Sequence, residues 1–400
     1  MKFTPSGYKK ECAIYTISWL LYESQGVLGI GALAKYLIFF LIAYSLFRTI
    51  YVSVKFRFGP FMKGLTVLFL LLSVYGIYHL IFGRTRIISG FTSYTIVPTF
   101  YNLKYIYCSI PNVYVYYFFA KRGVFTPKSL TKYAFLFIIA AVLTFFNHYS
   151  AGNEINGSYE YVDGITNNTG YKFVPIMALA FLTYRYKSLL EYFSYFFIIL
   201  SLKRGAFLIG SVSLIGFLSL VIKKAKGFKR FQAQLFAALT ILLASLFVIH
   251  FFQNSEGFRN RIEMTLEGNS SGRDIIAEKI TDYFQNQTDY VAIAFGNGAD
   301  ATIDIAGNYA HNDWLELLIN QGILGVSIFF IFYMLWFKNY LMMRKKVSLN
   351  VSMAFGVAFI GSFGASIFSM AYTAFGPSWS IVIGYCLSEY SKHCSFSKIR

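Results

Sequence analysis

Four residues of this 400-residue chain combine chemistry for holding an anion with chemistry for moving a proton. They are the isolated pair Lys203 and Arg204 in FFIILSLKRGAFLIG, Arg273 in SSGRD, and His311 in NYAHNDWLEL. A guanidinium can hold two phosphate oxygens at once, and an imidazole titrates near neutral pH and can accept a proton from a hydroxyl. The four residues therefore predict an anion site with a proton acceptor beside it.

Each of these residues also has a purely structural explanation. A cationic pair at a helix end can reach water along its aliphatic stems, and Arg273 can pair with Asp274 or Glu278. A lone histidine before a helix is more often a hydrogen-bonded structural residue, and Asn312 is expected to cap the helix that follows His311. The histidines and cysteines lack metal-ligand spacing, so we expect neither a metal nor another cofactor.

The elements that must position these residues are membrane helices. Hydrophobic residues make up 56% of the chain and charged residues only 14%, against about 25% charged residues in a typical soluble domain. Repeated apolar runs near 20 residues match the roughly 30 Å hydrocarbon core of a bilayer. We therefore expect an all-α polytopic membrane protein that forms a single integral-membrane domain over residues 1–400.

About twelve apolar segments are expected to cross the membrane. They fall at about 12–30, 33–54, 64–82, 93–120, 133–150, 172–187, 188–202, 205–222, 232–251, 312–337, 349–371 and 374–390. Proline in a membrane helix frees backbone groups that need protein or water partners. Because the fourth segment contains Pro98 and Pro111, we expect it to be kinked and not to face lipid along its whole length.

Basic clusters predict the orientation. Clusters without acidic residues, as in cytoplasmic loops, lie at both termini and at 55–63, 121–132, 223–230 and 338–346. With twelve spans, all of these basic clusters fall on the same side of the membrane, which is then the cytoplasmic side. This distribution accounts for the net charge of +18 without nucleic acid, so we expect no nucleic-acid partner.

The opposite, extracytoplasmic side receives the Lys203–Arg204 turn, the loop at about 147–171 and one long loop at 252–311. Arg84 and Arg86 also fall there against the positive-inside trend, and charges in such places usually remain because they bind something. In the long loop, Gly296-Asn297-Gly298 lacks the βαβ context of a nucleotide-binding loop. We interpret it as a turn that folds the loop back toward its end.

At these positions the chain resembles the O-antigen ligase and O-antigen polymerase superfamily of bacterial membrane glycosyltransferases. LKRGAFL (202–208) is similar to the family's Ser-Arg-Gly element, and SGR (271–273) to its loop arginine. GNGAD followed by AHNDWLELLINQGILG (310–325) is similar to its glycine-rich turn, histidine and leucine-rich helix. The motifs cover about residues 200–337. The chain departs from the family by having Lys203 in place of serine and no tryptophan shortly after Arg273.

The resemblance implies a metal-independent glycosyltransferase of the GT-C type in the bacterial inner membrane, with its active site facing outside. Its substrates would be undecaprenyl-pyrophosphate-linked oligosaccharides, and its other partners membrane lipids and a chain-length regulator protein. Arg204 and Arg273 would hold the pyrophosphate, and His311 would assist the acceptor hydroxyl or the leaving group. Further substrate contacts are expected from Lys203, Asn312, Arg84 and Arg86, and sugar contacts from Tyr159 and Tyr161.

Several functions remain open on this sequence. The resemblance implies a polymerase of O-antigen or capsule repeat units, and the alternative within the family is a ligase that passes the glycan to lipid A-core or protein. A lipid-linked sugar transporter or flippase is the alternative from another class, although it would carry its charges near mid-membrane on broken helices. A non-catalytic assembly subunit would tolerate the loss of His311.

Overall fold

The computed structural model describes residues 5–82, 86–87, 95–96, 106–156, 169–254, 259, 263, 273–369 and 375–394. Its regular structure is helical except for one antiparallel pair of two-residue strands, β1 (Arg86–Ile87) and β2 (Thr95–Ile96), with Arg86 opposite Ile96. The helices are α1 (Pro5–Glu23), α2 (Gln25–Leu28), α3 (Gly31–Lys55), α4 (Pro60–Phe82), α6 (Asn112–Lys121), α7 (Pro127–Asn156), α8 (Gly170–Ala180), α9 (Lys187–Leu200), α10 (Arg204–Lys224), α11 (Phe228–Asn254), α13 (Arg273–Asn286), α14 (Tyr290–Phe295), α15 (Ala301–Ala306), α16 (Asp313–Arg344), α17 (Leu349–Phe368) and α18 (Pro377–Lys392).

Seven of the described helices are long and apolar enough to cross a membrane, which indicates a multi-pass membrane protein. They are α3, α4, α7, α10, α11, α16 and α17, and each coincides with one of the predicted spans. The other five predicted spans overlap α1, α6, α8, α9 and α18, which are shorter or less apolar. The all-helical class is therefore confirmed, and the number of twelve crossings stays a prediction.

The tyrosine-rich segment near α6 lies inside the protein. Pro111 precedes α6, as expected for a residue that lacks a backbone N–H, and residues 112–120 are all buried. Asn112 ties this helix to its neighbours: its side-chain oxygen accepts a hydrogen bond from Trp19 at 2.9 Å, and its amide donates to the carbonyl of Phe375 at 3.1 Å. In this part of the segment, the predicted break at proline and the predicted shielding from lipid are both confirmed.

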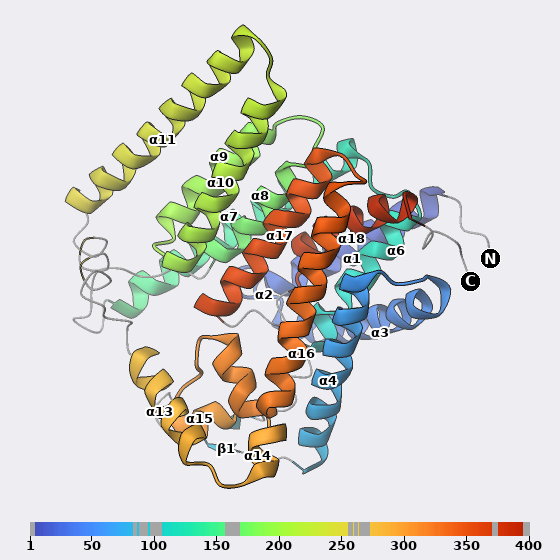
Figure 1. The fold of residues 1–400 in the computed structure, drawn as a ribbon, viewed down its shortest axis with the longest axis vertical. Coiled ribbons are helices and arrows are strands. Elements are labelled where there is room, and N and C mark those ends of the chain that lie inside the picture. Colours follow the sequence, from blue (N-terminus) through green and yellow to red (C-terminus); the bar gives the residue numbers. More distant parts are fainter. Residues whose placement is uncertain are drawn as a thin grey trace.

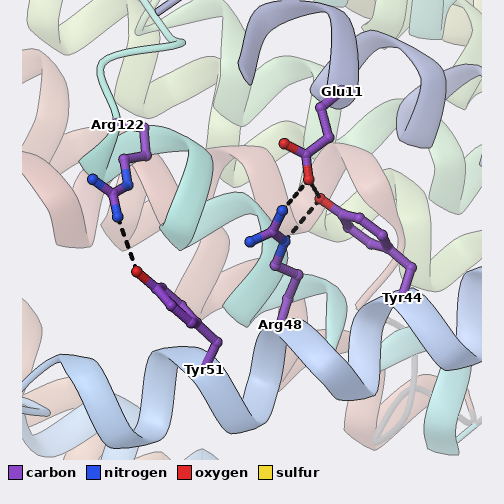
Figure 2. A network of polar contacts seen from close by, with 5 residues as sticks. All are labelled: Glu11, Tyr44, Arg48, Tyr51 and Arg122. Atoms are coloured by element: carbon purple, nitrogen blue, oxygen red, sulfur yellow. Dashed lines mark hydrogen bonds and ion pairs between the residues drawn. The ribbon is translucent and has the colours of Figure 1, made fainter. Parts of the chain in front are cut away.

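An ion pair joins α1 to α3 (Figure 2). Glu11 accepts hydrogen bonds from Arg48 and from the Tyr44 hydroxyl, and Arg48 Nε donates to that hydroxyl at 2.9 Å. Arg122, which follows α6, donates to the hydroxyl of Tyr51 in α3 at 3.0 Å. These contacts hold α1, α3 and the end of α6 together next to the basic cluster 121–132.

The described part of the long loop forms three short helices, α13, α14 and α15, which gather at one end of α16 (Figure 1). α13 and α15 share a small hydrophobic core with α16, which is separate from the main core and consists of Ile280, Ala301, Ala306, Ala310 and Ile319, whereas α14 contacts α16 outside this core. The loop is therefore attached to the start of α16 by its own packing.

Helix α16 is broken at Gly322, whose backbone angles are φ 65° and ψ −163°. The Gly-Asn-Gly turn binds the carbonyl groups next to this break: Asn297 N donates to Ile319 O at 2.8 Å, and Gly298 N donates to Asn320 O at 2.9 Å. The backbone around Ala294 packs so closely against this break that a Cβ at Gly322 would lie 2.6 Å from the carbonyl of Ala294. The predicted turn is confirmed, and it satisfies backbone groups that the break leaves without helical partners.

Candidate functional site

Lys203 and Arg204 occupy a tight turn between two helices, as the sequence predicts. α9 ends at Leu200 and α10 begins at Arg204, and Leu202 between them has a left-handed φ of 53° that residues other than glycine rarely adopt. The hydroxyl of Ser201 stabilises the turn by donating to Ile198 O at 2.6 Å and accepting from Lys203 N at 3.3 Å. Lys203 is half-buried and Arg204 is exposed.

Three helices meet at the glycine that follows Arg204. A Cβ at Gly205 would lie 2.1 Å from the hydroxyl oxygen of Tyr171 and 2.7 Å from the Cβ of Phe368. Tyr171 belongs to the first turn of α8, and Phe368 is the last residue of α17. The glycine of the Lys-Arg-Gly sequence is therefore required by close packing of α8, α10 and α17.

Arg273 lies beside this junction. It is the first residue of α13, and its Nη1 donates a hydrogen bond to the carbonyl oxygen of Phe368 at 3.0 Å. Burial lowers the pKa of Arg273, the neighbouring Tyr171 raises it, and the charge of Arg204 lowers it. The structure thus brings together two arginines that are 69 positions apart in the sequence.

His311 is held by the start of α16. It has a left-handed φ of 50°, and the N–H of the preceding Ala310 donates to Glu316 Oε2 at 2.9 Å. Asn312 caps α16, since its side-chain oxygen accepts hydrogen bonds from two N–H groups of the first turn at 2.9 and 3.2 Å. The predicted cap is confirmed, and it leaves only the amide nitrogen of Asn312 for a substrate.

Glu316 is a positioning residue that the sequence interpretation missed. Its buried carboxylate accepts hydrogen bonds from the Thr302 hydroxyl, from Asn320 Nδ2 at 2.9 Å and from the backbone before His311. It thereby connects α15, the His311 segment and α16. The sequence did contain a signal for Glu316, because it is an acidic residue among the apolar residues that follow His311. Charged residues are rarely buried unless they have partners, so an acidic residue in such a place is expected to make specific contacts.

Neighbouring cations make the electrostatic potential at His311 positive. Burial lowers the pKa of His311, and the charges of Arg273 and then Lys203 lower it further. The imidazole is therefore neutral at pH 7, which is the form that can accept a proton. The same interactions place His311, Arg273 and Lys203 within electrostatic reach of one another.

A cavity of about 810 Å³ opens beside these residues, a size within the usual range for ligand sites. Lys203, His311 and Tyr171 line it, whereas Arg204 and Arg273 are not among its lining residues. Its wall also carries aromatic and polar side chains from α1, α8 and α18, including Trp19, Tyr22, Glu23, Lys172, Ser378 and Trp379.

Some predicted contacts lie outside the described residues. These are Arg84, Tyr159 and Tyr161, together with the side chain of Arg86, whose backbone forms part of β1. In the part of the chain that the structure describes, no three histidine, cysteine, aspartate or glutamate side chains are grouped so that they could hold a metal ion.

The arrangement suits reactions in which a phosphate group leaves. Fixed cations stabilise negative charge as it develops, and a neutral imidazole can take a proton from an attacking hydroxyl. No protein-family model and no curated protein matches the chain.

Proposed function

We propose that the protein is a metal-independent membrane glycosyltransferase that takes a glycan from a polyprenyl pyrophosphate and passes it to a sugar hydroxyl. The observation that carries this proposal is the grouping of Arg273 and the Lys203–Arg204 turn around a neutral His311 beside a cavity. A cluster of cations suits a polyanion, and a pyrophosphate offers several oxygens to it.

The proposed reaction breaks the bond between the anomeric carbon and the pyrophosphate oxygen. The electron pair leaves with the pyrophosphate, where Arg204, Arg273 and Lys203 stabilise the added negative charge. The acceptor hydroxyl oxygen forms the new bond to the anomeric carbon, and its proton passes to His311. The lowered pKa of His311 supports this role, because the imidazole is unprotonated before the reaction.

The remaining cavity wall supports a sugar as the acceptor. Trp19 and Trp379 offer flat apolar surfaces, while Glu23 and Lys172 offer an acceptor and a donor whose charged atoms lie 3.8 Å apart. Aromatic surface combined with a few polar groups is the usual lining of a site for an amphipathic ligand such as a sugar ring.

Within this class we propose a polysaccharide polymerase of the bacterial inner membrane, which adds a growing undecaprenyl-linked chain to a new O-antigen or capsule repeat unit. This part rests on the resemblance of residues 200–337 to the O-antigen polymerase and ligase superfamily. Twelve crossings, an outward-facing site and a chain-length regulator partner belong to the same proposal. A ligase that transfers the glycan to lipid A-core or protein is the alternative that the experiment below separates.

A transporter fits the site less well. Transporters commonly expose unwound backbone carbonyls to their substrate at breaks in helices. α16 has such a break at Gly322, but the carbonyls of Ile319 and Asn320 are bound by the Gly-Asn-Gly turn, and Gly322 does not line the cavity. The break therefore supports the loop and not a transport pathway.

The test replaces Arg204, Arg273 and His311 singly with alanine and follows polysaccharide chain length in the native host. We expect each change to reduce transfer by on the order of 100-fold or more, so that a polymerase leaves single repeat units. A ligase would instead leave long chains on the lipid carrier. Arg230→Ala and His250→Ala are matched controls from α11. Long chains on the final acceptor in all three variants would show that the proposal is wrong.

A further inference from the structure

Tyr171 carries a buried hydroxyl that has no hydrogen-bond partner within the described residues. An unpaired polar group that is shielded from water destabilises a fold, because its lost hydrogen bonds to water are not replaced. Such a group is therefore expected to have a partner that the protein binds.

Tyr171 lies beside the proposed reaction site, with its hydroxyl oxygen packed against Gly205 at the junction of α8, α10 and α17. Tyr171 lines the same cavity as Lys203 and His311. Its oxygen would be 2.1 Å from a Cβ at Gly205, so it lies directly over the glycine that follows Arg204. It is also an electrostatic neighbour of Arg273, whose own side chain is anchored to Phe368 O at 3.0 Å.

Packing alone does not explain the hydroxyl. A phenylalanine ring would fill the same space between α8, α10 and α17, and the absence of a side chain at Gly205 is what makes room for the additional oxygen. The surrounding cations favour a ligand atom with negative charge, and the phenolic O–H can donate a hydrogen bond to such an atom.

We propose that Tyr171 is a further catalytic residue, which donates its hydroxyl hydrogen bond to an oxygen of the departing pyrophosphate. This inference rests on the proposed glycosyl transfer and adds a neutral donor to the cations of the site. The donor contributes most when the oxygen gains charge, so its effect falls on the rate of transfer more than on the binding of the acceptor sugar.

The experiment compares Tyr171→Phe with the wild type in purified full-length protein, using a synthetic polyprenyl-pyrophosphate glycan as donor. We expect kcat to fall by on the order of 100-fold with an unchanged KM for the acceptor. Inhibition by inorganic pyrophosphate should weaken as well, while Tm should equal or exceed that of the wild type. Tyr192→Phe, which removes a buried hydroxyl outside the cavity, should change neither kinetic value.

Three results would overturn the inference. Wild-type kinetics and pyrophosphate inhibition in Tyr171→Phe, with Arg273→Ala inactive, would remove Tyr171 from the reaction and leave the proposed function intact. A fall in Tm together with the loss of activity would assign the hydroxyl a structural role. Full activity of both Arg273→Ala and His311→Ala would remove the proposed function, and the inference with it.

Discussion

The cations around His311 decide which proton role this residue can take. An imidazolium next to Arg273 and Lys203 is destabilised by charge repulsion as well as by burial, so the neutral ring is the resting form. A neutral ring serves as a base at the start of a reaction. The same repulsion helps the ring to release the proton after the product leaves.

The contribution of Lys203 can be measured as a pH dependence. The base form of His311 is lost as pH falls through its lowered pKa, so the activity of the wild type should persist below the ordinary histidine value near 6.5. Lys203→Met removes one cation and raises the pKa of His311, which should move the acid limb of the pH profile to higher pH. Lys229→Met is the control, and an unmoved acid limb in Lys203→Met would contradict the electrostatic argument.

The sequence revealed candidate site residues where a charged residue stood in a place that usually lacks one. Lys203 and Arg204 stood out because they are cations between two apolar segments on the predicted outer side, and Arg273 stood out because SGR (271–273) is similar to the loop arginine of the family. Tyr171 could not stand out, because the chain has 32 tyrosines and only the folded structure shows which hydroxyls of the described residues are buried without a partner.

At the level of elements, the site depends on how α16 begins. Its first two turns carry the Asn312 cap and Glu316, and they end at a break where the Gly-Asn-Gly turn binds the backbone. A second contact from the bundle supports this turn, because the hydroxyl of Tyr75 in α4 donates to Phe295 O at 2.6 Å. His311 is therefore positioned by the Asn312 cap, by the Glu316 carboxylate and by the backbone contacts of the Gly-Asn-Gly turn.

Gly322→Ala tests this support. The new Cβ would lie 2.6 Å from the carbonyl of Ala294 and would hold alanine at a left-handed φ of 65°. We expect the free energy of unfolding to fall by on the order of 1–3 kcal/mol, seen as a lower Tm in detergent, with loss of transfer activity. Gly216→Ala in α10 is the control, because its Cβ would meet only the end of Met353 at 3.4 Å. Equal Tm values for the two variants would contradict this role of the break.

Helix periodicity and turn residues predicted some of these elements and not others. The apolar residues of DIIAEKITDYF recur at helical spacing, and α13 covers this stretch. The short helices α14 and α15 were not predicted, since six residues hold too little periodicity to be recognised. The break at Gly322 was also missed, because glycine within an apolar helix is common and its left-handed backbone depends on the partner turn.

Across the whole molecule, one basic connection, at 223–230, lies at the end opposite the helices that precede His311. The connection between α10 and α11 lies far from α13, α14 and α15 (Figure 1). This separation supports the proposed orientation, with Lys-rich and Arg-rich loops in the cytoplasm and the His311 segment outside.

Cysteine labelling can test this orientation with little background, because Cys12, Cys108, Cys386 and Cys394 are all buried. We expect Tyr290→Cys, at an 85% exposed position in α14, to react with a membrane-impermeant maleimide in spheroplasts. Lys229→Cys, at the exposed start of α11, should react only after the membrane is permeabilised. The reverse pattern would place the His311 segment in the cytoplasm and contradict the proposed site.

The break in α16 also bears on how the chain enters the membrane during synthesis. A straight helix of 32 residues would be about 48 Å long, well beyond a hydrocarbon core of roughly 30 Å. The part from Ile323 to Arg344 alone would measure about 33 Å, close to the thickness of that core. In the proposed orientation, Gly322 would mark where a translocating chain changes from exported to inserted sequence. The same glycine would then set the boundary of the span and the position of the turn that supports His311.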